Sequence, residues 1–200
     1  MNAKNSLLRR AVFVVALLNF GYFFVEFSVA HSIGSVSLFA DSIDFLEDTA
    51  VNILIFMALG WSLHRRSMVG MALAAILLIP GLFTLWTAWG KFLIPLPPDA
   101  TLLSLTGSGA LVVNIICAFV LVRYRKHSGS LTRAAFLSAR NDAFANVAII
   151  GAGFITLLTL SAWPDLIVGL AIFLINLDAA RQVYTAASKE RADALESTKA

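Results

Sequence analysis

Six apolar stretches, each about as long as a membrane-spanning helix, most constrain what this chain can fold into. They cover about residues 11–30, 37–62, 68–90, 102–123, 134–160 and 165–184. A bilayer-spanning helix needs roughly 20 mainly apolar residues. Only 14% of the residues are charged, against about 25% in a soluble domain. The sequence therefore predicts an all-α polytopic membrane protein with six transmembrane helices.

Lysine and arginine residues gather at alternate ends of these stretches, which predicts the orientation of the chain. The links at 31–36, 91–101 and 161–165 hold one basic residue, Lys91. Since cytoplasmic flanks are enriched in Lys and Arg, both termini are expected in the cytoplasm, and the expected location is a bacterial inner membrane. The same flanks explain the net charge of +3 without a nucleic-acid partner. The basic residues are Lys4, Arg9, Arg10, Arg65, Arg66, Arg123, Arg125, Lys126, Arg133, Arg181, Lys189, Arg191 and Lys199.

Little of the chain remains outside the membrane. We expect one six-helix transmembrane domain over residues 1–185 and a short charged cytoplasmic tail over 186–200. The single cysteine, Cys117, excludes an intrachain disulfide and a thiolate metal cluster. No nucleophile–base arrangement or phosphate loop is recognisable, so the sequence does not indicate an enzyme.

Six of the twelve acidic residues fall in the interior of the predicted spans, and two more, Asp165 and Asp178, lie near the ends of the sixth. Each ionised carboxylate near the bilayer centre costs roughly 2.5–3.5 kcal/mol on insertion scales. One arginine in a span, Arg140, cannot neutralise all of them. The six residues are Glu26, Asp41, Asp44, Glu47, Asp48 and Asp142. Intramembrane ionisable residues of this kind indicate a functional site.

Helical spacing places the acidic residues of the second span on one face. Asp41, Asp44 and Asp48 follow each other at i, i+3 and i+7. If this face packs against Asp142, at least three carboxylates meet, and such a cluster must be protonated or bound to a cation. Oxygen ligands suit Mg, Ca or Mn and also hold Zn, Co or Fe(II). The pattern predicts a metal site that exchanges a cation for protons.

Other polar residues in the spans have competing interpretations. Glu26 is expected to be an architectural hydrogen-bond partner, and Asp41 either an auxiliary ligand or a helix cap. Glu47 is expected to form a structural ion pair with Arg140, with an auxiliary ligand role as the alternative. The fifth span carries Ser138, Asp142 and Asn146 at the same four-residue spacing as Asp44, Asp48 and Asn52. Two polar faces are therefore expected to meet.

The run "EFSVAHSIGSVSLFADSIDFLED", from Glu26 to Asp48, resembles the first and second helices of the cation diffusion facilitator family. These transporters carry Ser-x-Ser-Leu-x-x-Asp, then a metal ligand three residues later and an aspartate four further on. The resemblance implies Asp44 and Asp48 as ligands. "SARNDAFANVAII" is similar to the fifth helix of the family, which implies Asp142 as a ligand, with Ser138 where the family has His or Asp. It also implies a homodimeric cation/proton antiporter that exports Zn, Co, Cd, Fe or Mn as substrate, with no other cofactor.

Two departures from the family pattern affect these expectations. Ser138 is a poor ligand, so Asn141, Asn146 or water is an alternative fourth ligand, and the hard donor set favours Mn, Fe(II) or Mg while zinc stays open. The family's usual cytoplasmic domain has no counterpart in these 200 residues, so a homodimer is expected to rest on membrane helices. Two other functions stay open: a non-transporting sensor, scaffold or partner subunit, and a proton-coupled transporter of another solute.

Overall fold

The computed structural model describes residues 3–58, 68, 81–124 and 130–176, and their regular structure is helical. No strand occurs in this part of the chain. The all-α prediction is therefore confirmed. The helices are α1 (Ala3–Ile33), α2 (Val36–Ala58), a helix over 81–93, α4 (Ala100–Val122), α5 (Ser130–Thr159) and the helix Trp163–Asn176.

By length and apolar composition, three helical segments among the described residues could cross a bilayer: Ser6–Ile33, Ala100–Val122 and Ser138–Thr159. The helix α2 has a similar length but carries four acidic residues. These carboxylates interrupt its apolar character, as expected of a span that holds a polar site. The last residues of the second and sixth predicted spans, 59–62 and 177–184, lie outside the described residues. Residues 69–80 of the third predicted span also lie outside them.

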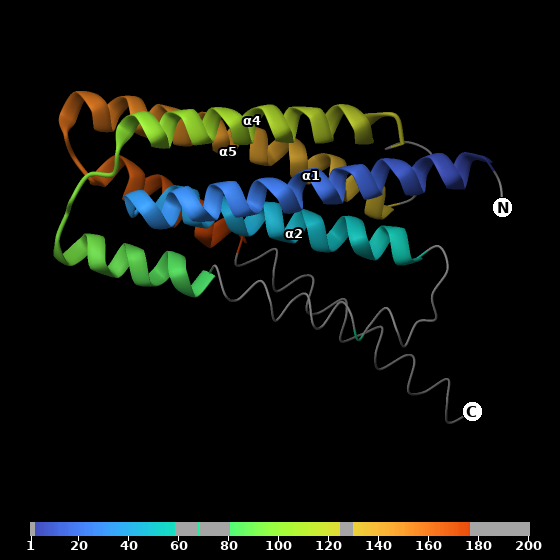
Figure 1. The fold of residues 1–200 in the computed structure, drawn as a ribbon, viewed down its shortest axis with the longest axis horizontal. Helices are drawn as coiled ribbons and strands as arrows, with labels where there is room; N and C mark the ends of the chain where they lie inside the picture. The colour runs from blue at the N-terminus through green and yellow to red at the C-terminus, as the bar shows by residue number, and fades with distance from the viewer. Residues whose placement is uncertain (1–2, 59–67, 69–80, 125–129, 177–200) are drawn as a thin grey trace.

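Three short links lie at the same end of the helix bundle, and we call this the linker end (Figure 1). They are the turn between α1 and α2, the segment over 94–99, and the segment over 160–162. The N-terminus lies at the opposite end (Figure 1). Successive described helices therefore alternate in direction, as the six-span prediction requires.

The sequence at two of these links explains how the chain turns. Gly34 adopts φ +63° between α1 and α2, a left-handed conformation that glycine enters without steric cost. Asp99 precedes α4, and its carboxylate accepts a hydrogen bond of 2.8 Å from the backbone N–H of Leu102. This is an N-cap, which satisfies one of the free N–H groups in the first turn of a helix.

The main helix contacts in the described part of the bundle are α1 with α2, α4 with α5, α1 with α4, and α2 with α5, and α2 touches α4 more lightly. Small residues allow α4 and α5 to approach closely. A side chain added at Gly107 would meet Ile149 of α5 at 3.0 Å, and one added at Gly153 would meet the Ser104 hydroxyl of α4. Ala135 and Ala139 on α5 are buried in the cluster that includes Leu121.

Candidate metal-binding site

The helix α2 turns its carboxylates into the bundle. The side chains of Asp41, Asp44 and Asp48 are 0%, 8% and 2% exposed. Helical spacing places them along one face, and α1, α5 and, more lightly, α4 contact this helix. The carboxylates therefore lie inside the protein and not against lipid.

The helix α5 brings Ser138 and Asp142 to this face. The Ser138 side chain lies close to the carboxylates of both Asp48 and Asp142. The two polar faces recognised in the sequence thus meet where α2 packs on α5. Ser138, which stands where the resemblance implies a metal ligand, lies between the two aspartates.

The carboxylates repel one another across this contact. Asp44 interacts electrostatically with Asp142, Asp41 and Glu47. Asp142 interacts in turn with Asp48, Asp41 and Glu47. No three Asp, Glu, His or Cys side chains among the described residues are arranged closely enough to hold one metal ion. A cation would have to draw the aspartates of α2 and α5 inward.

The expected ion pair between Glu47 and Arg140 is wrong. Arg140 is exposed, and its guanidinium donates a 3.2 Å hydrogen bond to the neighbouring Asn141. Glu47 is half-buried on α2. The four-residue helical repeat that carries Ser138 and Asp142 inward turns Arg140, two residues from each, to the opposite side of α5. The carboxylates therefore receive no compensation from this arginine.

Buried asparagine amides replace a cation as the nearest partners of the aspartates. Asn146 of α5 donates a 2.5 Å hydrogen bond to Asp41 and accepts one of 3.0 Å from Asn114 of α4. Asn19 of α1 donates to Asp48 over 3.4 Å. Asn146 thus has both polar atoms of its side chain engaged. The sequence reasoning missed Asn19 and Asn114, which stand alone within apolar runs and could have been found by that feature.

Two further asparagine amides donate to carbonyl groups of α2, one from α2 itself and one from the helix Trp163–Asn176. Asn52 donates to the backbone carbonyl of Asp48 over 2.8 Å. Asn176 donates to the carbonyl of Ala40 over 3.2 Å and contacts the carboxylate of Asp44. The bond from Asn176 ties α2 to the helix Trp163–Asn176, whereas the bond from Asn52 stays within α2.

Glu26 of α1 lies against Asp41 instead of joining the other aspartates. Its side chain is fully buried, and neither of its oxygens receives a hydrogen bond from a donor among the described residues. The carboxyl group of Asp41 is its neighbour on α2. The architectural hydrogen bond that the sequence analysis expected of Glu26 stays a prediction.

A second buried polar cluster lies at the linker end, separate from the carboxylates of α2. Asp165 accepts hydrogen bonds from the hydroxyls of Ser35 and Ser37, both at 2.7 Å. It also accepts from the backbone N–H groups of Val36 and Ser37 at 3.0 and 3.1 Å. The ammonium group of Lys91 lies 2.8 Å from the same carboxylate. Sequence reasoning placed Lys91 and Asp165 at span ends but did not pair them.

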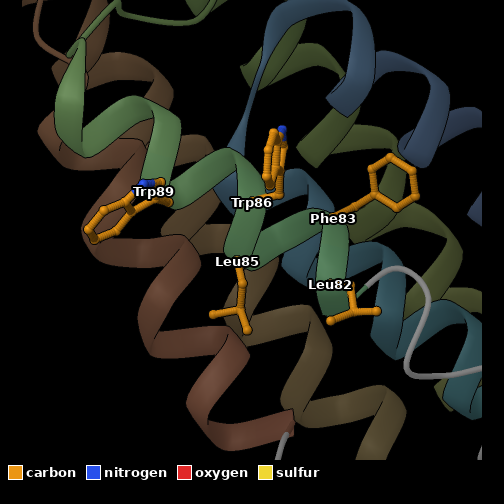
Figure 2. Close-up of a pocket in the computed structure, with 5 residues that line it drawn as sticks. All are labelled: Leu82, Phe83, Leu85, Trp86 and Trp89. Atoms are coloured by element: carbon orange, nitrogen blue, oxygen red, sulfur yellow. The ribbon is translucent and has the colours of Figure 1, made fainter.

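The hollow shown in Figure 2 is apolar and is not part of the carboxylate site. Its described lining consists of five side chains from the helix over 81–93, and its volume is about 560 Å³. Trp86 and Trp89 are 79% and 63% exposed on this helix. Such exposed tryptophans near a helix end are typical of a membrane interface. The lining residues are Leu82, Phe83, Leu85, Trp86 and Trp89.

Comparison with known proteins supports the sequence resemblance. Residues 12–189 match the family model of the cation efflux transmembrane domain. The match includes α2 and α5, which carry the aspartates described above. No curated protein matched the sequence.

Proposed function

Since the chain belongs to the cation efflux transmembrane-domain family, we propose that it exchanges a divalent metal cation for protons and exports the metal from the cytoplasm. The family identifies a membrane protein that transports metal cations. The contact of Asp48, Ser138 and Asp142 between α2 and α5 carries the finer proposal.

The chemistry of the donor set supports a metal cation as the substrate. Asp44, Asp48 and Asp142 supply carboxylate oxygens, and Ser138 supplies a hydroxyl oxygen. Such ligands suit Mn, Fe(II) and Mg best and also bind Zn, Co or Cd. Asp41 and Asn146 bond each other, so we keep them as supports of the site and not as ligands. Glu47 and Asn141 remain auxiliary candidates.

Proton coupling follows from the like charges that meet in the site. Three carboxylates drawn together in a membrane bundle would be stable when they bind either a divalent cation or protons. Metal binding then displaces protons in one conformation, and protonation displaces metal in the other. We propose further that both termini face the cytoplasm of an inner bacterial membrane and that two copies associate through their membrane helices.

Metal-driven proton movement in proteoliposomes tests this proposal. The vesicles enclose a pH-sensitive dye, and Zn, Co, Cd, Mn, Fe(II) or Mg is added outside. We expect at least one metal to drive proton movement, and Asp48→Ala and Asp142→Ala to abolish it. Ser108→Ala is the matched control, because this hydroxyl bonds only the carbonyl of Ser104 on its own helix.

Two results would contradict the proposal. If no metal moves protons, the chain is not a metal/proton exchanger. If flux persists in both aspartate variants, the α2–α5 contact is not the transport site. A proton leak without metal dependence would favour a transporter of another solute, and silence in every assay would favour a sensor or partner subunit.

A further inference from the structure

The cluster of Lys91, Asp165, Ser35 and Ser37 joins three parts of the chain at the linker end. Lys91 belongs to the helix over 81–93, Asp165 to the helix Trp163–Asn176, and the serines to the start of α2. Asp165 is fully buried and Lys91 is 7% exposed. We propose that this cluster, called the latch below, closes the linker end and opens when the metal passes to that side. The inference rests on the proposed transport function.

Backbone packing beneath the latch shows how tightly the linker end is closed. A side chain added at Gly169 would lie 2.6 Å from the backbone nitrogen of Ser37 and 2.6 Å from the carbonyl carbon of Val36. The helix Trp163–Asn176 therefore meets the first turn of α2 backbone to backbone. The Asp165 carboxylate caps that same turn with two N–H bonds. An opening at the linker end has to separate these two elements.

The latch lies at the linker end, beyond the proposed metal site. Ser37 and Asp44 are seven residues apart on one face of α2, which corresponds to about 10 Å along a helix. An aromatic cluster includes Phe39, which lies between Ser37 and Asp44 in α2. Phe27 packs on Phe39 and on Phe83, with ring centroids 5.3 Å apart in each pair. Phe83 and Lys91 belong to one helix, so movement of this helix would displace both layers together.

The charges of the latch favour two arrangements, one with Lys91 and Asp165 in contact and one with the two residues apart. Asp165 is buried with Lys91 as the cation bonded to it. Removing one partner of a buried ion pair leaves an uncompensated charge in a low dielectric. Lys91 is followed by exposed residues of the segment over 92–97. Separation of the pair would therefore carry Lys91 toward water while Asp165 becomes accessible at the open end.

The native cysteine provides a reporter that needs no metal transport. The Cys117 thiol is buried and donates a 3.5 Å hydrogen bond to Asn19, which in turn donates to Asp48. It thus lies beside the carboxylates, and modification from the linker end requires that end to open. The test measures modification of Cys117 by a membrane-impermeant methanethiosulfonate in vesicles of known orientation, applied separately to each side, with Cys117→Ala as the background.

We expect Lys91→Met and Asp165→Asn to raise the rate from the linker side roughly tenfold, through a shift in the population of open molecules. The rate from the opposite side is expected to stay level or fall. Asp99→Asn is the matched control, because Asp99 also caps a helix near this end but bonds no lysine. Asn at 165 keeps an acceptor for the cap, so this variant carries the test if Lys91→Met does not fold.

Unchanged rates in both variants would overturn the proposal. So would an equal rise from both sides, because that pattern indicates a loosened fold and not a gate. Since Cys117 modification is measured without metal, failure of the latch is distinguishable from failure of metal transport in the flux assay.

Discussion

Ser138 is the residue whose chemistry most distinguishes this site, because it lies between Asp48 and Asp142 and contributes a neutral hydroxyl. A hydroxyl neutralises no charge and binds metal more weakly than imidazole or carboxylate. Its value here is geometric, since one hydroxyl contacts an aspartate from each of two helices. Under the proposed function, Ser138 would hold the two carboxylates in register for a cation.

Ser138→Ala should weaken metal binding roughly tenfold while the protein stays folded, because the contact that orients both aspartates is lost. Ser138→His should shift preference toward zinc, since imidazole is a softer ligand than a hydroxyl. Calorimetric titration with Mn and Zn measures both effects, with Ser108→Ala as the control. Equal Mn and Zn affinities in Ser138→His and the unaltered protein would count against a ligand position at residue 138.

At the scale of elements, α2 is the helix on which the others converge. It accepts hydrogen bonds from Asn19 of α1, Asn146 of α5 and Asn176 of the helix Trp163–Asn176, and it donates hydrogen bonds to Asp165 of that last helix. These bonds involve α2 at Val36, at the neighbouring residues Ala40 and Asp41, and at Asp48. Movement of any neighbouring helix therefore changes the surroundings of the acidic face.

Gly169→Ala should wedge the helix Trp163–Asn176 away from α2, because the added methyl group would meet backbone atoms that cannot move aside. We expect a loss of about 1–3 kcal/mol in unfolding free energy and faster Cys117 modification from the linker side. Thermal unfolding in detergent measures the first effect. Gly151→Ala is the control, since nothing lies within 4 Å of an added methyl group there. Equal melting temperatures for the two variants would contradict the close approach.

Sequence patterns predicted the helices better than the contacts that hold them together. Apolar length and four-residue spacing were enough to predict helical spans and the inward face of Asp44 and Asp48. They could not pair Lys91 with Asp165, which are 74 residues apart, because side-chain partners across a bundle leave no periodic signal. Arg140 was misassigned for a related reason: a charge inside an apolar stretch does not reveal which side of its helix faces lipid headgroups or water.

For the whole molecule, the carboxylates of the site oppose stability in the absence of metal. Asp142→Asn should raise the unfolding free energy of the metal-free protein by on the order of 1 kcal/mol, since it removes one of the like charges facing α2. The same variant should lose the stabilisation that bound metal gives the unaltered protein. Thermal unfolding with and without Mn or Zn measures both terms. A metal-free Asp142→Asn protein less stable than the original would show that Asp142 is structural.

The exposure of Arg140 also has a consequence for energy use. An arginine beside the aspartates would act as a permanent resident cation, and the empty carrier could then return across the membrane without cargo. Each such return would let protons cross the membrane without any export of metal. With amides as the nearest partners of the aspartates, an empty and fully ionised carrier is penalised in both orientations. Under the proposed function, the protein should therefore rarely cross between its two orientations while empty. Proton entry should stop when a high external metal concentration stops the exchange.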